Sequence, residues 1–222
     1  MTDRPTMPDE TAPSAAIAAA TRERAYAALA EADPVFRPLI EQHGTPDPFL
    51  FPDGGRTAGS NFAGMVLHII AQQISTRVAL VIYDRLAVAT GSPPTPQSLL
   101  ELTGDQLRAL GMSRSKATYV HGLAEDVESG ALQIDHLDRL GDREAVDALT
   151  RVKGIGPWSA EMFLIHQLRR PDILPAGDLG IRTAVRRLYA LAETPPIDDV
   201  RRRGSAWAPH RTYAATLLWL SL

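Results

Sequence analysis

The sequence predicts an all-α fold. Apolar residues recur at spacings of three and four along most of residues 21–222, as they do on the buried face of a helix. We find no convincing alternation of apolar and polar residues of the kind that is typical of a strand. Several helix starts can also be named. Thr95 precedes a proline, Thr103 has a glutamine three residues on, Ser113 follows a glycine by two residues, and Asp142 is expected to cap the helix after it.

The chain is long enough for one compact domain or for two small lobes that share a core. It has 222 residues, of which 45% are hydrophobic, so a sizeable core can be buried. Residues 1–20 are rich in Pro, Ala, Thr and acidic side chains and lack apolar periodicity. We therefore expect a disordered tail over 1–20 and a folded domain over 21–222.

Composition excludes several classes of function. The chain has no cysteine, which rules out disulfides, cysteine nucleophiles, cysteine-ligated zinc and iron–sulfur clusters. Its six histidines are scattered without paired ligand spacing. No segment approaches the roughly 20 apolar residues of a membrane span, and the start of the chain is unlike a signal peptide. We expect a cytoplasmic protein (nucleoid-associated if bacterial), with no membrane partner and no obligate protein partner.

Charge is distributed unevenly along the chain. The formal net charge is −3, but residues 151–222 carry 11 Lys and Arg against 6 Asp and Glu, a net charge of +5. The preceding residues carry 12 and 20, a net charge of −8. This favours the last third as a surface that faces a polyanion, although a solvated helical face would have the same pattern.

The most informative short segment is the turn Lys153-Gly154-Ile155-Gly156, which is followed by Pro157 at the start of a helix. Two glycines one residue apart permit a positive φ and close approach of the backbone to a partner. Proline is well placed in a first helical turn, and the free amides there form an anion site at the positive end of the helix dipole. A DNA phosphate would suit this site. By itself the pattern also fits an ordinary helix corner with a glycine cap.

The surrounding sequence favours a phosphate-binding turn over an ordinary helix corner. The block VKGIGPWSAEMFL, followed by PAGDLGIRTAV, resembles the helix-hairpin-helix and the Gly/Pro-rich loop with a catalytic Asp that define the HhH-GPD DNA glycosylase superfamily. Within it the chain resembles the alkylpurine branch, 3-methyladenine DNA glycosylase II. The likeness extends to residues 69–75, 110–124 and 207–219, and so covers about residues 25–220. The chain is similar to short members that lack an extra N-terminal domain.

The resemblance implies two helical lobes with the extruded nucleotide held in the cleft between them. Residues 60–150 would contain much of one lobe, and 21–59 with 151–222 would form the other. The implied activity is base excision repair by a monofunctional glycosylase, which hydrolyses the N-glycosidic bond of alkylated purines such as 3-methyladenine and 7-methylguanine. Its partner would be double-stranded DNA containing damaged bases.

The resemblance places the catalytic carboxylate at Asp178, after the loop 175–177 and at the start of a helix. Breaking an N-glycosidic bond leaves positive charge on the sugar, which a fixed carboxylate stabilises while it orients or deprotonates the attacking water. An isolated Asp at a helix start is usually only an N-cap, and Asp178 can also serve as one.

Trp158 separates two mechanisms. Superfamily members that also cut the strand have a lysine nucleophile two residues beyond the second glycine of the hairpin. Here that residue is Trp158, so no Schiff base can form and water must be the nucleophile. The indole can instead stack on an electron-poor alkylated base, or it can simply pack in the core.

The resemblance also implies roles for further residues. The turn Lys153–Gly156 and Arg182 would contact phosphate. The base pocket would be lined by Gln72, Trp158, Met162, Trp207 and His210, although Met162 may equally fill the core and relatives have tryptophan at the position of His210. The wedge that enters the minor groove would come from Gln73, Ile74 and Ser75. A monovalent cation would bind the backbone carbonyls of Thr150, Val152 and Ile155. No cofactor is required.

Three alternatives remain open at this level. The same chemistry may act on deaminated or oxidised bases, because the motifs barely distinguish lesions. The chain may be a DNA-binding module that kept the hairpin and lost catalysis, although the intact loop around Asp178 argues against this. A purely structural helical bundle would lack salt-dependent DNA binding.

Overall fold

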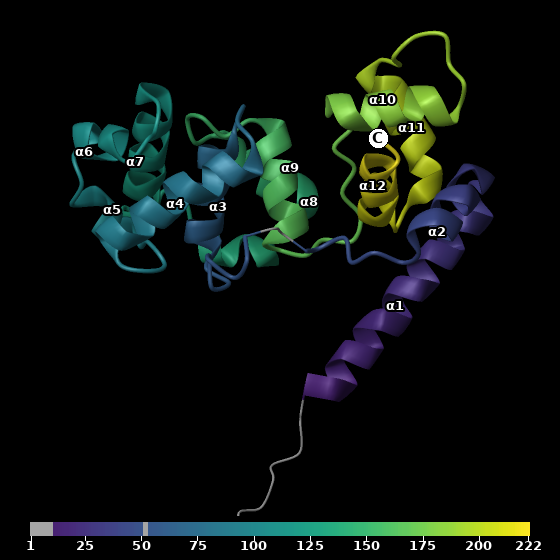
Figure 1. Ribbon diagram of the computed structural model, residues 1–222, viewed down its shortest axis with the longest axis horizontal. Coiled ribbons are helices and arrows are strands. Elements are labelled where there is room, and N and C mark those ends of the chain that lie inside the picture. The colour runs from purple at the N-terminus through teal and green to yellow at the C-terminus, as the bar shows by residue number, and fades with distance from the viewer. Residues whose placement is uncertain (1–10, 51–52) are drawn as a thin grey trace, which may run out of the picture.

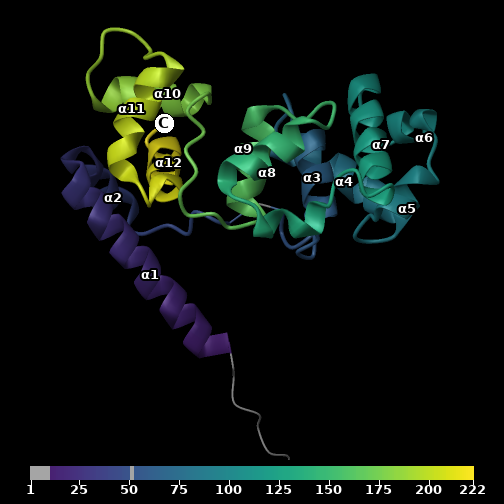
Figure 2. The same ribbon diagram turned by 180° about the vertical axis from the view of Figure 1, so that it is seen from behind.

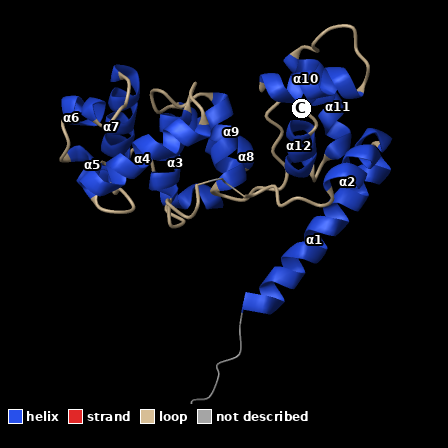
Figure 3. Ribbon diagram, in the orientation of Figure 1, coloured by secondary structure: helices blue, strands red, loops and turns tan. Residues whose placement is uncertain are grey.

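The computed structural model describes residues 11–50 and 53–222, and these residues form helices and loops without any strand (Figure 3). The all-α prediction is therefore confirmed. The elements in chain order are α1 (Thr11–Ala32), η1 (Pro34–Phe36), α2 (Arg37–His43), α3 (Asn61–Ala71), α4 (Thr76–Thr90), α5 (Pro96–Leu100), α6 (Gly104–Ala109), α7 (Arg114–Glu128), η2 (Ile134–Arg139), α8 (Asp142–Thr150), α9 (Pro157–His166), α10 (Leu179–Leu188), α11 (Ile197–Gly204), η3 (Ser205–Trp207) and α12 (Arg211–Leu220).

Two hydrophobic cores define two lobes (Figures 1 and 2). The first lobe contains α3 to α9, and its core runs from Phe62 to Ile173. The second contains α1, α2 and α10 to α12, so it joins the two ends of the described chain. The central helix of the first lobe is α3, in which every residue from Phe62 to Ile70 is buried. A helix that is apolar on all sides must be surrounded, and α4, α7 and α9 pack around it.

The boundary between the lobes differs from the prediction. Residues 151–173 belong to the first lobe and not to the second, because α9 packs on α3 and α8 and its residues Met162 to Ile165 lie in the first core. The prediction separated α8 from α9 at the hairpin turn. The two helices form a single packed pair, so the change of lobe comes only after Ile173.

The N-terminal segment also differs from the prediction. Helix α1 begins at Thr11, so residues 11–20 are helical, whereas residues 1–10 of the expected tail lie outside the described residues. Alanine is the best helix former, and this segment is rich in it even though it has no apolar stripe. The buried part of α1 lies further along, at Ala25, Tyr26 and Leu29.

Two chain segments connect the lobes, one between α2 and α3 and one between α9 and α10 (Figure 1). Trp219 on α12 packs against both cores. The second connection is fastened by a bidentate ion pair in which Arg211 donates from Nε and Nη2 to Asp172, each over 2.7 Å. No helix among the described residues is long and apolar enough to cross a membrane.

Local capping follows the sequence closely. Thr95, Thr103 and Ser113 are N-caps whose side chains accept a hydrogen bond from the backbone amide three residues on. The prediction for Asp142 is wrong by one residue. Gly141 is the N-cap of α8, and the Glu144 carboxylate accepts from its backbone amide over 3.0 Å.

Candidate active site

The turn between α8 and α9 is a tight hairpin. The Val152 amide donates to the Leu149 carbonyl and the Ile155 amide to the Val152 carbonyl, both over 3.1 Å. Gly156 is the N-cap of α9 and Pro157 occupies the first helical position. The first amides of a helix have no acceptor within it, so this turn presents donors at the positive end of α9. An anion is the natural ligand for such a turn.

Glycine is required at one position of the hairpin. Gly154 has a φ of +94°, and a Cβ built there would lie 2.2 Å from Cγ of the Tyr119 ring on α7. Any side chain would therefore combine backbone strain with a clash against an aromatic ring. The ring of Tyr119 thus packs directly against the hairpin backbone at Gly154.

Gln72 joins the hairpin to the end of α3. Its Nε2 donates to the Gly154 carbonyl over 2.9 Å and to Ser159 Oγ over 3.1 Å. The next residue, Gln73, is exposed and has a φ of +58°, which is uncommon for a residue other than glycine. The turn between α3 and α4 is consequently anchored by Gln72, with Gln73 projecting beside the hairpin.

These turns line a polar groove of about 620 Å³ together with the start of α7. Backbone amides, hydroxyls and amide side chains dominate the groove, so it is suited to a polar or anionic ligand. The residues that line it are Gln72, Gln73, Ser113, Ser115, Lys116, Tyr119, Gly154, Ile155, Gly156 and Ser159.

Asp178 is half-buried and is held by three hydrogen bonds. It is the N-cap of α10, where its Oδ1 accepts from the Ile181 amide over 2.9 Å. The same oxygen accepts from Trp219 Nε1 over 3.2 Å, and Oδ2 accepts from Trp158 Nε1 over 2.8 Å. The cap, the two indoles and the dipole of α10 together fix the orientation of the carboxylate and stabilise its negative charge.

The carboxylate lies where both lobes meet. Trp158 belongs to the first turn of α9, directly after the hairpin, whereas Asp178 and Trp219 belong to the second lobe. The bond from Trp158 therefore connects the hairpin to the carboxylate. The Trp158 side chain remains 41% exposed, and Leu179 beside Asp178 is 68% exposed. Apolar surface is thus open to a ligand next to a fixed negative charge.

A second carboxyl group lies on the same side of α9. Glu161 follows Trp158 by three residues, and burial raises the pKa of its carboxyl to about 7. The positive charge of Arg201 lowers that pKa and the negative charge of Asp178 raises it.

Residues 66–210 match the family described as HhH-GPD superfamily base excision DNA repair protein. This stretch holds the hairpin, Asp178, most of the first lobe, and α10, α11 and η3 of the second. The chain belongs to the HhH-GPD superfamily.

Relatives within the HhH-GPD superfamily agree with this assignment. The chain is 34% identical to DNA-3-methyladenine glycosylase 1 of Schizosaccharomyces pombe over 158 residues, which are 70% of this chain and 69% of that protein. It is 30% identical to the putative DNA-3-methyladenine glycosylase YfjP of Bacillus subtilis over 165 residues, 71% of this chain and 58% of that protein. The curated relatives place the chain in the 3-methyladenine glycosylase branch.

Solved structures of the superfamily share the fold. The S. pombe 3-methyladenine DNA glycosylase in complex with abasic DNA superposes with a TM-score of 0.77 at 30% identity, over 88% of this chain and 95% of that one. The 3-methyladenine DNA glycosylase of Archaeoglobus fulgidus gives a TM-score of 0.72 at 29% identity, over 90% of this chain and 68% of that one.

Two residues expected in the base pocket of this HhH-GPD chain lie in cores. Trp207 is 1% exposed, packs edge-on against Phe36 and donates from Nε1 to Asp33 over 3.1 Å. Met162 is 5% exposed within the first core. Both side chains are therefore occupied by packing, and their assignment to the base pocket stays a prediction. His210 is half-buried and lies edge-on to Tyr213.

The basic residues also have internal partners. Arg182, expected on phosphate, donates from Nε to the Pro195 carbonyl over 2.9 Å. On α11, Arg201 pairs with Asp198 over 3.1 Å and Arg202 pairs with Asp199. Arg203 lies over the ring of Tyr189. These arginines are thus engaged within the protein, while Lys153 at the hairpin is exposed.

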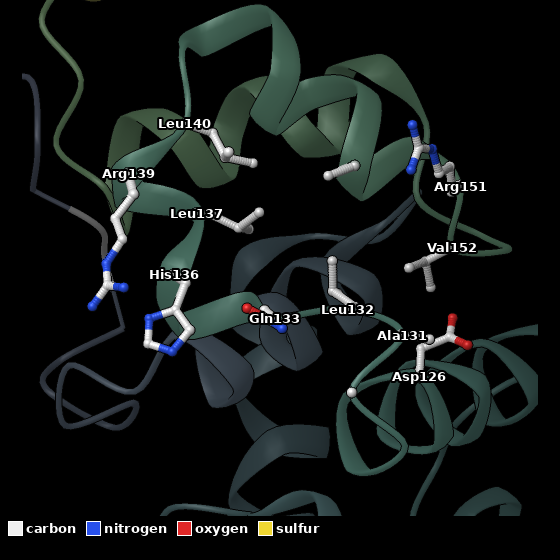
Figure 4. Close-up of a pocket in the computed structure, with 12 residues that line it drawn as sticks. Asp126, Ala131, Leu132, Gln133, His136, Leu137, Arg139, Leu140, Arg151 and Val152 are labelled. Carbon is white, nitrogen blue, oxygen red and sulfur yellow. The ribbon is translucent and has the colours of Figure 1, made fainter.

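A separate pocket of about 580 Å³ is lined in part by Arg151 and Val152, next to the hairpin turn, and does not include Asp178 among its lining residues (Figure 4). Its apolar part includes Leu132, Leu137, Leu140 and Val152. Arg139 and His136 lie on one side, and Arg151 and Asp126 lie on the other. Among the described residues no group of three or more His, Cys, Asp or Glu is arranged to hold a metal ion.

Sequence reasoning missed Trp219 and Glu161. Trp219 is the last residue of the segment 207–219, in which the resemblance points to Trp207 and His210. Its position in an apolar helix gave no sign that the indole N–H would reach a carboxylate 41 residues away. Glu161 had a usable signal, because it is an acidic residue among the apolar residues of α9.

Proposed function

We propose that this protein is a monofunctional DNA glycosylase of base excision repair, which hydrolyses the N-glycosidic bond of alkylated purines such as 3-methyladenine and 7-methylguanine in double-stranded DNA. The observation that supports this most strongly is the bond from Trp158 to Asp178. It joins a phosphate-binding hairpin to a fixed carboxylate beside exposed apolar surface. The names of the relatives support the alkylated substrates.

In this proposal the hairpin amides and Lys153 contact a backbone phosphate. The carbonyls of Thr150, Val152 and Ile155 would hold a monovalent cation, which would supply positive charge near the phosphate. The Val152 carbonyl keeps one lone pair besides its bond to Ile155. Gln73, with Ile74 and Ser75, fills the gap that the extruded nucleotide leaves in the duplex. The exposed ring of Trp158 stacks on the extruded base.

In this proposal the Asp178 carboxylate promotes hydrolysis of the N-glycosidic bond. As the bond from C1′ to the base nitrogen breaks, the electron pair leaves with the base and positive charge develops on the sugar. The negative charge of Asp178, already oriented by three hydrogen bonds, stabilises that state without further reorganisation. Water adds to C1′ and loses a proton, which leaves an abasic site. A cationic alkylated base leaves readily, so modest catalysis is enough.

Two measurements test this function. Incubation with duplex DNA that carries methylated bases should release free 3-methyladenine and 7-methylguanine, which chromatography identifies. Borohydride should trap no covalent complex with DNA, because Trp158 replaces the lysine needed for a Schiff base. Release of only deaminated or oxidised bases would assign another substrate. Binding that falls with salt but releases no base would indicate a DNA-binding module without catalysis.

A further inference from the structure

The polar groove beside the hairpin contains a cation and no anion. Its lining comes from the turn after α3, the start of α7 and the hairpin, and Lys116 is the only charged side chain among the described residues that line it. The exposed Lys153 lines a different pocket, together with Asp105 and Glu125. The positive charge inside the groove therefore comes from Lys116, and no carboxylate of the groove neutralises it.

The end of α3 holds the ammonium group of Lys116 in place. Its Nζ donates to the Ile70 carbonyl over 2.8 Å, and the side chain is half-buried. Ile70 lies in the last turn of α3, where carbonyls lack a partner within the helix and the helix dipole is negative. Among the described residues, Lys116 forms no ion pair with a carboxylate. It is thus a fixed cation without a counter-ion.

This arrangement leaves donors available to a ligand. An ammonium group has three N–H donors, and the Ile70 carbonyl takes one of them, so two remain. Because the long side chain is already anchored, it has less rotamer freedom to lose when a ligand binds. The first amides of α9, after the N-cap Gly156, add donors on the hairpin side of the groove. The groove is therefore organised for an anion.

We propose that Lys116 binds a phosphodiester of the DNA backbone in this groove, as the charged partner of the hairpin amides. This inference rests on the proposed glycosylase function and adds a binding residue to its DNA site. Lys116 lies in the part of the sequence before residue 151, which has a net charge of −8, so the charge distribution along the chain does not point to it. The bound phosphate and the end of α3 would share one ammonium group.

The salt dependence of DNA binding measures this contact. Each neutralised phosphate contributes about 0.9 to the slope of log K against log salt concentration. We expect Lys116→Gln to reduce the steepness of that slope by about 0.9, and to lower affinity about 5–10-fold at about 0.1 M salt. Fluorescence anisotropy with a duplex that carries a stable abasic-site analogue gives both quantities. Arg143→Gln is the matched control, because it removes an exposed charge from the end of α8 far from the hairpin, and should change neither.

Two further variants separate phosphate binding from support of α3. Lys116→Met also lacks the charge and should reduce the slope as much as Lys116→Gln, whatever the loss of the bond to Ile70 does to stability. Lys116→Arg keeps the charge and should retain the slope of the unaltered protein. Thermal unfolding shows that each variant is folded before the slopes are compared.

The possible outcomes distinguish the contact from the glycosylase function. A slope that Lys116→Gln and Lys116→Met leave unchanged would overturn the inference, because a residue that only supports α3 releases no counterions. An equal reduction in Arg143→Gln or in Lys116→Arg would also overturn it. If the slope falls as expected but the unaltered protein releases no methylated base, the phosphate contact stands and the glycosylase function is refuted.

Discussion

The indole N–H of Trp158 donates to Oδ2 of Asp178 over 2.8 Å and thereby joins the two lobes. Trp158 follows the hairpin directly, and Asp178 begins the first helix of the second lobe. In the proposed function, a phosphate at the hairpin would be connected through this one side chain to the carboxylate that acts on the sugar. Position along the DNA backbone and position at the reacting bond would then be set together.

Replacement of Trp158 by phenylalanine tests this connection. The aromatic ring remains available for stacking, but the donor to Asp178 is lost. A hydrogen bond to a charged group contributes about 1.5–3 kcal/mol, so single-turnover base release should fall by about 10–100-fold. DNA affinity should change little. An unchanged rate would mean that the cap bond and Trp219 are enough to orient the carboxylate.

Gly154→Ala should damage the hairpin more than a glycine change elsewhere. Its Cβ would meet the Tyr119 ring at 2.2 Å, in addition to a positive φ. Gly130→Ala is a matched control, because Gly130 has a φ of +77° and nothing within 4 Å of the added Cβ. Thermal unfolding should show a loss of about 1–3 kcal/mol for Gly154→Ala beyond that of the control. Equal losses would show that only backbone strain matters.

Gln72 and Gln73 should have separable roles although they are adjacent. Gln72→Ala leaves the Gly154 carbonyl and Ser159 Oγ without their shared donor, and should cost about 1–3 kcal/mol of folding stability. Gln73→Ala removes an exposed side chain and should change stability by less than about 0.5 kcal/mol. If Gln73 is the wedge, its variant should release base more slowly from duplex DNA and much less slowly from single-stranded DNA. Equal effects on both substrates would contradict the wedge assignment.

Two adjacent histidines, one buried and one half-buried, predict how stability depends on pH. His68 on α3 and His166 on α9 are stacked with ring centroids 5.7 Å apart, and burial lowers their pKa values to about 3 and about 4. The unfolded chain binds protons at these histidines below about pH 6.5, whereas the folded chain does not until about pH 4. Unfolding therefore takes up protons in this window, and the free energy of unfolding should fall as pH decreases from 6.5 to 4.

Denaturant unfolding measured at several pH values checks this prediction. Two protons taken up correspond to a slope of up to about 2.7 kcal/mol per pH unit from these residues. His166→Gln should reduce that slope by about half, and replacement of the exposed His136 should leave it unchanged. A stability that is flat between pH 6.5 and 4 would show that the folded protein accommodates the charged forms.

Whether a contact in this structure can be predicted from the sequence depends on how far apart the two residues are along the chain. Side chains that act locally were predictable: Thr95, Thr103 and Ser113 cap helices within three residues of themselves. The hairpin glycines and Asp178 were found from motifs. Contacts between distant segments were not predictable. Trp207 bonds to Asp33 in the second core, and Trp219 reaches Asp178 from the far end of its helix. Periodicity identifies a buried face but not the residues that cover it.

Helix α1 illustrates a different limit. Residues 11–20 lack an apolar stripe, so a search for amphipathic helices passes over them. Their alanine content instead favours a helix through backbone propensity. An apolar stripe and a high alanine content are independent signals of a helix, and residues 11–20 have only the alanine content.

Asp178→Asn is the most direct test of the central claim. Asparagine is as good an N-cap as aspartate and still offers an oxygen to the Ile181 amide, so the fold should be retained. The negative charge is lost, together with the acceptor for Trp158 Nε1, because an amide nitrogen takes the place of Oδ2. We predict that release of 7-methylguanine from a duplex oligonucleotide becomes undetectable while DNA affinity is unchanged or tighter. Base release at an undiminished rate by the folded variant would contradict the account.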